Sequence, residues 1–467
     1  MRIQPALVLV VVLVSAALLP MSVTGVSVAL PEIGPDLSAD LASVQWVATA
    51  YHTAFASSVL AAGALADRLG VRRCFAVGLA IWGGAGVAGG FADDIVQLDL
   101  LRVVGGVGGA LAAASSVGLL AHSFPGPART RVFGLFGIAL GVGMSCGPWL
   151  AGLLVEGFGW RSVFVVLGAL GLVLLGATPL LPDVRHPRKG RFDWIGTGTF
   201  AAALALGIFA FVQGPAFGWT HPLVVGAFVG SPVLLALFVT VQRRRPDPMI
   251  DLTLLAQPRF VGILTAAAAV AVVVVPMVVY LPSYLTGVVG MAPGAAGATT
   301  FLITAPALVL PLAGAALLRW FPDRAVIVAA VVAVCVGAAG STVIGPDSTT
   351  LGLALPLLTM GVGIGLSMGL LDRLGVGSVG PTRAATGSGL VTTARMVSET
   401  VGIAVVGSVL AGTTGGRLTD PGFTGGLRAV LWTMAGVTVV AAVVVAVLVR
   451  HREPSHPAPK PPVSAGI

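Results

Sequence analysis

Long apolar segments alternate with short polar connectors along the whole chain. A membrane-spanning helix needs about 20 apolar residues, and we predict fourteen such spans, at residues 7–30, 43–66, 74–92, 97–121, 133–155, 163–181, 195–214, 222–241, 259–282, 296–318, 325–345, 350–371, 386–411 and 427–449. The first apolar run is longer than the core of a signal peptide, so we read it as an uncleaved span. The pattern predicts an all-α membrane protein.

Two longer polar connectors, at residues 182–194 and 242–258, divide these spans into groups of six, two and six. We therefore expect an N-terminal six-helix bundle at 1–182 and two extra spans with their connectors at 183–258. A C-terminal six-helix bundle is expected at 259–449. The proline-rich tail at 450–467 is predicted to be disordered and cytoplasmic.

Composition agrees with a membrane location. The chain is 56% hydrophobic and only 9% charged, whereas a soluble domain carries about 25% charged residues. Its net charge of +8 does not indicate nucleic-acid binding, because the basic residues form short clusters between spans, as at Arg243–Arg245. With an even number of spans most of these clusters fall on the side of the N-terminus. The positive-inside rule then places both termini in the cytoplasm.

Residues 63–73 read GALADRLGVRR and follow the second predicted span. They resemble the signature loop of the major facilitator superfamily, and the match covers Gly63, Asp67, Arg68, Gly70, Arg72 and Arg73. The resemblance implies that Asp67 faces the N-terminus of a helix in the other half, where the helix dipole favours a carboxylate. The loop would then be a conformational latch. The alternative is a basic loop that only orients the protein.

The fourth predicted span contains RVVGGVGGA at residues 102–110. An arginine inside a membrane by default marks a polar pathway, and the four glycines allow close helix packing. The segment resembles the fourth-helix motif of the same superfamily, which implies a role for Arg102 in proton coupling. In the alternative reading Arg102 snorkels to the outer surface beside Asp99.

The fifth predicted span contains GVGMSCGPWLAG at residues 141–152. Gly143, Gly147, Pro148 and Gly152 match the fifth-helix motif of antiporters, although a kinked packing helix has the same local pattern. Together with VALP at 28–31, WVATAY at 46–51, FDWIG at 192–196 and GSGLVTTAR at 387–395, these motifs resemble the fourteen-helix drug:proton antiporter branch. The resemblance implies a major facilitator fold arranged 6+2+6.

Few groups inside the spans can titrate. Ser22 stands where many members of that branch carry an aspartate, and the first span has no acid at all. Glu399 is the acid placed well inside an apolar stretch, and it either carries protons or forms a stabilising pair with Arg395 four residues earlier. His52 is a second proton-coupling candidate, or a hydrogen-bonded packing residue.

These observations predict a secondary active transporter that exports hydrophobic small molecules in exchange for protons. A dedicated exporter of one metabolite or antibiotic is the alternative. No GxxxxGK[ST] loop is present, which disfavours ATP-driven pumping, and no catalytic or metal-type cluster forms at helical spacing, which disfavours an enzyme. A receptor is disfavoured because no segment is long enough to fold a soluble domain. We expect no cofactor, no metal, no nucleic acid and a functional monomer in the plasma membrane of a high-GC bacterium. Helix position alone suggests that the substrate cavity is lined by Met21, Trp46, Tyr51 and Phe55.

Overall fold

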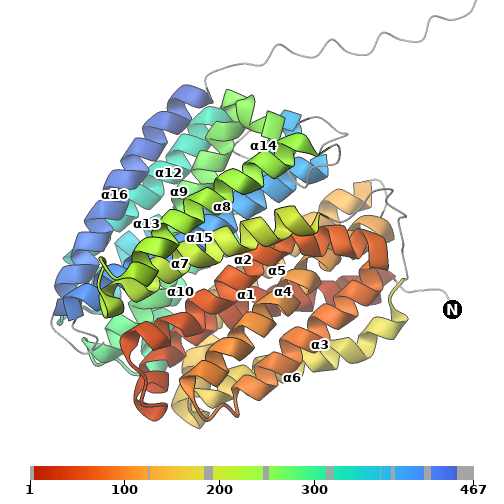
Figure 1. Cartoon of the computed structure of the whole chain (residues 1–467). Coiled ribbons are helices and arrows are strands. Elements are labelled where there is room, and N and C mark those ends of the chain that lie inside the picture. Colours follow the sequence, from red (N-terminus) through yellow and green to blue (C-terminus); the bar gives the residue numbers. More distant parts are fainter. Residues whose placement is uncertain are drawn as a thin grey trace, which may run out of the picture.

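The computed structural model of the chain describes residues 5–124, 127–182, 193–245, 252–311, 317, 320–368, 370–379, 384–414 and 422–449. Within these residues all regular secondary structure is helical. Figure 1 shows two bundles of long helices side by side, with a helical pair lying against both of them. The predicted all-α class is confirmed.

The first bundle, here called the N-half, contains six long helices. They are α1 (Pro5–Asp36), α2 (Leu41–Leu69), α3 (Val71–Gly89), α4 (Ile95–Ser123), α5 (Pro127–Phe158) and α6 (Arg161–Ala177), the last continuing into the short helix η1 (Thr178–Leu180). Consecutive helices run in opposite directions. We call the two ends of the molecule the Asp36 end and the Gly70 end, after the connections that follow α1 and α2.

The second bundle, the C-half, begins after η2 (Leu252–Ala256). It contains α9 (Pro258–Gly287), α10 (Pro293–Thr304), η3 (Ala305–Leu308), α12 (Asp323–Gly340), η4 (Ser341–Val343), α13 (Thr350–Ser367), α14 (Leu370–Val379), α15 (Ala384–Thr414) and α16 (Gly422–Leu448). The sequence had predicted a connector where α14 lies. Met368 leaves the helical conformation and ends α13, so the amphipathic residues that follow form a short helix of their own.

The extra pair, α7 (Trp194–Phe217) and α8 (Pro222–Arg244), packs α7 against α2 of the N-half and α15 of the C-half. A small apolar cluster forms this joint from Ala56, Leu204, Ile208, Val212 and Ala404. The two helices lie across the front of Figure 1 between the halves. Only 17% of the most apolar 18-residue stretch of α8 is buried inside the protein. Most of this helix therefore lies on the outside of the bundle.

Local sequence explains where many helices begin and end. Asp40, Asp94, Asp193 and Thr349 each accept a hydrogen bond from a backbone N–H three residues later, and so cap α2, α4, α7 and α13. Such caps satisfy backbone donors that a helix leaves free at its first turn. A single residue, Gly70, joins α2 to α3 with φ of 99°. Residues that carry a side chain rarely adopt a positive φ of this size, so a glycine is required at this position.

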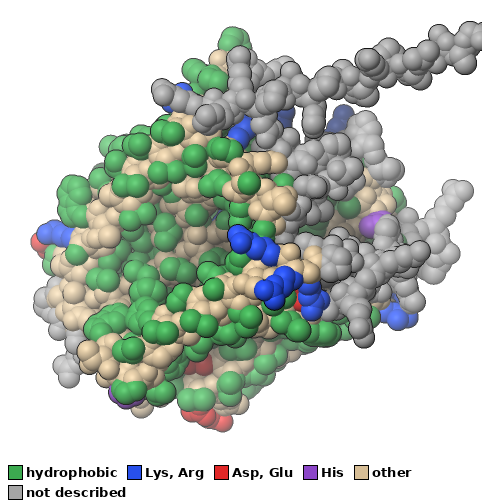
Figure 2. All heavy atoms as spheres, turned by 45° about the horizontal axis from the view of Figure 1, so that its top comes forward, with side chains coloured by type: hydrophobic (Ala, Val, Ile, Leu, Met, Phe, Trp, Pro, Cys, Tyr) green, Lys and Arg blue, Asp and Glu red, His purple; other side chains and the backbone are tan. Residues whose placement is uncertain are grey.

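Twelve helices among the described residues are long and apolar enough to cross a membrane. The fourteen predicted spans are therefore not all recovered by this criterion. α2 is 29 residues long but carries polar side chains such as Gln45 and His52, and α10 is only 12 residues long. Large apolar side chains cover much of the outside, including Val173, Val229, Leu351 and Val440, and Figure 2 shows this apolar surface with few charged side chains on it.

Candidate functional site

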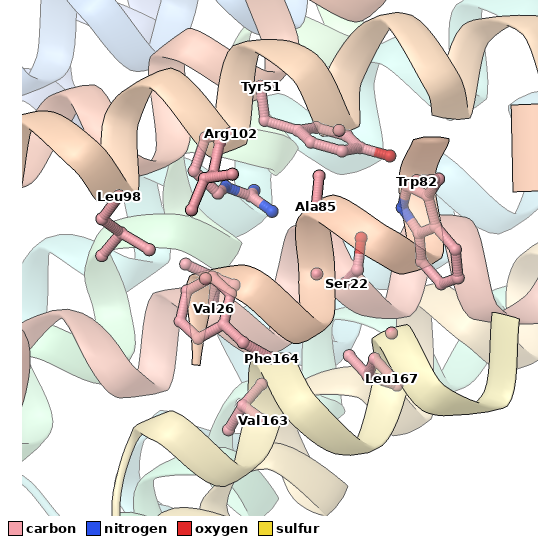
Figure 3. Close-up of a pocket in the computed structure, with 15 residues that line it drawn as sticks. Ser22, Val26, Tyr51, Trp82, Ala85, Leu98, Arg102, Val163, Phe164 and Leu167 are labelled. Carbon is pink, nitrogen blue, oxygen red and sulfur yellow. The ribbon is translucent and has the colours of Figure 1, made fainter. Parts of the chain in front are cut away.

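A small cavity lies inside the N-half among α1, α2, α3, α4 and α6. Its walls include Ser22, Tyr51, Trp82, Arg102 and Phe164, which Figure 3 shows converging on one space. The cavity offers about 30 Å³ to a molecule of water's size. It is too small for a drug-like compound, since ligand pockets span about 300–1,000 Å³.

Arg102 reaches this cavity from α4 and is only 7% exposed. Its Nε donates a 2.7 Å hydrogen bond to the carbonyl of Val47 on α2. Its guanidinium carbon lies 4.3 Å from the ring centroid of Tyr51 and 5.9 Å from that of Phe164. These are cation–π distances. The guanidinium is therefore turned into the bundle and does not snorkel to the surface.

Tyr51 and its neighbours on α2 form a buried aromatic group. Tyr51 stacks on Phe55 at 6.1 Å and meets the ring of His52 edge-on at 6.3 Å. The carbonyl of Ala48 lies 3.0 Å from Nδ1 of His52. Because a carbonyl only accepts hydrogen bonds, this contact requires a proton on Nδ1. Nε2 is then the nitrogen of His52 that is left to titrate.

The predicted helix-five motif packs α5 against α1 within the N-half. A Cβ added to Gly143 would meet the carbonyl oxygen of Ala17, and one added to Gly147 would meet Thr24 Oγ1 and the backbone of Met21. Side chains at either glycine would force the two helices apart. The two positions therefore require glycine for packing, as the small-xxx-small pattern predicted.

The same helix carries the contact to the other half. An added Cβ on Gly152 would lie 2.6 Å from the carbonyl oxygen of Pro293, and one on Gly297 would meet the carbonyl of Pro148. Ser145 Oγ donates a 2.7 Å hydrogen bond to the carbonyl of Thr304. One face of α5 thus belongs to the N-half and the opposite face touches α10.

The residues of the predicted latch loop lie at the Gly70 end. Arg72 Nη1 donates to the carbonyls of Pro179 at 3.4 Å and Leu181 at 3.3 Å, which ties the start of α3 to the end of α6. An added Cβ on Gly63 would meet nothing within 4 Å, and Arg73 is exposed. The side chains of Asp67 and Arg68 fall outside the described residues, so the latch remains a prediction.

Glu399 lies on α15 and is 5% exposed. Arg395, one turn earlier on the same helix, is the charged group that acts on it electrostatically. The carboxyl is therefore placed inside the C-half, far in sequence from Arg102 and His52 in the N-half. The helices that carry these proton-coupling candidates pack on one another, α2 against both α4 and α15, and the roles of the candidates stay predictions.

The four residues suggested for a substrate cavity lie in different surroundings. Tyr51 lines the small N-half cavity, and Phe55 stacks on it. Met21 packs where α1 meets Gly147, whereas Trp46 packs on the apolar cluster between α2, α7 and α15. Of the four, only Tyr51 lines the small N-half cavity, and their role in binding substrate stays a prediction.

Sequence reasoning missed a polar contact between the halves at the Asp36 end. Gln45 Nε2 on α2 donates a 2.7 Å hydrogen bond to the carbonyl of Gly407 on α15. Tyr280 Oη on α9 donates a 3.1 Å hydrogen bond to the carbonyl of Ile403, which lies one turn before Gly407 on α15. The available signal was a glutamine inside an apolar span, because buried polar side chains need partners.

A second missed cluster joins the Gly70 ends of α7 and α8. Asp193 accepts hydrogen bonds from the backbone N–H of Gly196 at 2.7 Å and from Nε2 of Gln242 at 2.6 Å. Arg245 Nη1 lies 3.2 Å from the same carboxylate. Asp193 thus supplies a buried cap that holds the extra pair together.

Comparison with known proteins gives a consistent result. A family model described as the Major Facilitator Superfamily matches residues 12–403. The puromycin resistance protein of Streptomyces alboniger is 33% identical over 447 residues, which cover 94% of this chain and 88% of that protein. The multidrug resistance protein Stp of Mycobacterium tuberculosis is 30% identical and covers 83% and 72%. The probable actinorhodin transporter of Streptomyces coelicolor is 32% identical and covers 85% and 71%.

Solved structures of similar fold are membrane transporters. A bacterial homolog of the human lysosomal transporter Spinster, in an inward-facing and occupied conformation, has a TM-score of 0.70 at 16% identity, covering 96% of this chain and 98% of that one. The nucleoside transporter NupG has a TM-score of 0.65 at 14% identity, covering 95% and 99%. At these identities the likeness concerns the fold alone.

Proposed function

The chain belongs to the Major Facilitator Superfamily, and we propose that it is a secondary active exporter that moves hydrophobic small molecules out of the cell in exchange for protons. The observation that carries this proposal is the 33% identity to a puromycin resistance protein in an alignment that covers 94% of the chain. Multidrug resistance and antibiotic export proteins match in a similar way. The family is one of transporters, not of enzymes.

We place fourteen crossings in the membrane, arranged as six, two and six. Two of these crossings, at α2 and α10, are not among the twelve apolar helices. The first is supported by the direction of α2, which runs opposite to α1 and α3, and the second by the continuation of α10 into η3. With fourteen crossings both termini lie at the Gly70 end. That end carries the basic residues Arg72, Arg73 and Arg243–Arg245, so we assign it to the cytoplasm.

Transport would proceed by alternating access between the halves. The contacts of α5 with α10 and of α2 with α15 hold the halves together toward the Asp36 end. Rocking of the halves would break these contacts and close the opposite end, where the Asp67 loop would latch. Substrate would bind near the midplane between the halves, as in other transporters of this architecture.

Glu399 is our first choice for the group that exchanges protons, with His52 second. Both are buried in spans, where an ionisable group is expensive unless it has a function. Arg102 and Arg395 would tune the neighbouring groups by their fixed positive charge. No acid lies on α1 besides Glu32 and Asp36 near its Asp36 end, so the first helix itself would not carry the proton across.

A dedicated exporter of one antibiotic is the second candidate. It is favoured by the names of several relatives, which refer to single compounds such as puromycin, actinorhodin and tetracenomycin C. Both candidates share the fold and the transport cycle. They differ in the breadth of compounds accepted.

A susceptibility panel tests the function. An efflux-deficient bacterial host carrying this gene should tolerate higher concentrations of several unrelated lipophilic antibiotics than the host with an empty vector. Tolerance to a single compound supports the dedicated exporter. Unchanged susceptibility to the whole panel, with the protein detected in the membrane, would contradict both candidates.

A further inference from the structure

The cavity in the N-half contains a buried positive charge for which the described residues offer no ion pair. Nη2 of Arg102 is buried without a hydrogen-bond partner. Figure 3 shows the guanidinium aimed into the cavity, between the ring of Tyr51 and that of Phe164. Asp99, one turn earlier on α4, acts on the guanidinium electrostatically, but no salt bridge joins the two among the described residues, and a charge removed from water is unfavourable without close partners.

No carboxylate lines the cavity. Asp99, one turn before Arg102 on α4, is not part of the wall, and its Oδ1 is itself buried without a hydrogen-bond partner. Ser22 on the facing helix α1 is neutral and spends its hydroxyl proton on the carbonyl of Leu19 at 3.1 Å. The compensating charge is thus not supplied by the lining side chains.

The polar atoms around the cavity are mostly donors. The guanidinium of Arg102 and the indole N–H of Trp82 can only donate, and the hydroxyl of Tyr51 can donate as well. The Tyr51 oxygen is buried without a hydrogen-bond partner, and the indole nitrogen of Trp82 faces it in Figure 3. A Cβ added to Gly109 would lie 2.5 Å from this oxygen and 3.4 Å from Cδ1 of Trp82, which confirms that the two groups are neighbours.

We propose that this cavity is a binding site for a small monovalent anion, of which chloride is the natural example, held by Arg102, Tyr51 and Trp82. The space of about 30 Å³ exceeds the roughly 10–15 Å³ that one water requires, so it admits a monatomic ion and excludes a drug. An anion accepts hydrogen bonds from all three groups and neutralises the guanidinium. A water molecule can also accept hydrogen bonds from these donors, but it carries no charge to offset that of the guanidinium.

The position of the site along α4 indicates from which end of the molecule an ion would have the shorter path to it. Arg102 is seven residues from the start of α4 at Ile95, which corresponds to about 10 Å along the helix. The cavity therefore lies closer to the Asp36 end than to the Gly70 end. Anions from that side would reach it without crossing the molecule.

Direct binding to the purified full chain tests the site. We expect saturable binding of radioactive chloride, and a higher unfolding temperature in sodium chloride than in sodium gluconate at equal ionic strength, because a ligand that binds only the folded state stabilises it. Both readouts are independent of transport and hence of the proposed function. Absence of chloride binding and of any chloride effect on the wild-type protein would overturn the proposal and leave the cavity to water.

Three variants locate the site. Tyr51→Phe keeps the ring under the guanidinium but removes the hydroxyl, and should weaken chloride binding about three- to tenfold, as expected for one hydrogen bond. Ser22→Asp places a carboxylate in the same cavity and should abolish chloride binding while the protein stays folded. Arg428→Gln is the matched control, because this exposed arginine also donates from Nε to a carbonyl, that of Ile344.

The control variant should bind chloride like the wild type. Undiminished binding by a folded Ser22→Asp protein would show that the ion sits elsewhere and would overturn the assignment. If Ser22→Asp fails to fold, Tyr51→Phe tests the assignment instead. Unchanged chloride affinity in that variant would remove Tyr51 from the site and contradict the proposed donor set.

Discussion

Gln45 and Gly407 are separated by 362 residues in the sequence, yet the side-chain amide of the first donates a 2.7 Å hydrogen bond to the carbonyl of the second. The contact joins α2 of the N-half to α15 of the C-half at the Asp36 end. The Gly407 position has no space for a side chain, because an added Cβ would meet the hydroxyl of Tyr280 and lie 2.8 Å from Cδ of Gln45. Two helices of different halves therefore meet there in van der Waals contact.

Substitution of Gly407 by alanine should open the Asp36 end. The new methyl group would push α2 away from α15 and break the Gln45 hydrogen bond. We expect faster hydrogen–deuterium exchange in residues 41–50 and 405–414 than in the wild type. Gly412→Ala is the control on the same helix, because a Cβ there would meet nothing within 4 Å. Equal exchange in the two variants would argue against a joint at Gly407.

The glycine face of α5 gives a second prediction. Gly147→Ala would place a methyl group against Thr24 and Met21 of α1, and such overpacking typically destabilises by about 1–3 kcal/mol. The unfolding temperature of the purified protein should fall. Gly137→Ala on the same helix meets no atom within 4 Å and should leave stability unchanged or slightly raised, because alanine is the better helix former. A similar loss in both variants would assign the effect to backbone conformation instead of packing.

Proton coupling can be separated from substrate binding. Glu399→Gln removes a buried titratable group of α15 at nearly constant shape, and His52→Ala removes the imidazole of α2. One or both should abolish drug uptake into inverted vesicles driven by an imposed pH difference, while drug binding persists. Glu156→Gln, which changes an exposed carboxylate, is the control and should retain transport. Full pH-driven uptake in both test variants would exclude these two groups as proton carriers.

The buried cap of the extra helix pair should matter for stability. Asp193→Ala removes three interactions at once and leaves the amide of Gln242 without this acceptor, so we expect a loss of about 1–3 kcal/mol. Asp40→Ala removes a single exposed cap of α2 and should be the milder change, near 1 kcal/mol. Thermal unfolding of the two variants provides the ranking. A larger loss for Asp40→Ala would contradict the role assigned to the Asp193 cluster.

The sequence determined the class of the protein, the helices and their order, because membrane helices satisfy their backbone hydrogen bonds locally and need only an apolar stretch of sufficient length. It also located the residues that bend or pack helices within one motif, such as Gly143, Gly147 and the turn at Gly70. The turn at Gly70 depends on neighbours in the chain, whereas the spacing of Gly143 and Gly147 marks a packing face without identifying the helix that meets it. Spans were also predicted at 43–66 and 296–318, where α2 and α10 lie, although α2 is too polar and α10 too short to count among the twelve helices that are long and apolar enough to cross a membrane.

Tertiary structure decided everything that depends on which faces of distant helices meet. Hydropathy does not record the rotation of a helix about its axis, and so the sequence left open whether Arg102 pointed to the surface or into the bundle, where it lies against Tyr51. It gave no partner for Gln45 and no neighbour for Trp82. Such contacts arise from packing between segments hundreds of residues apart, and only the assembled bundles define them.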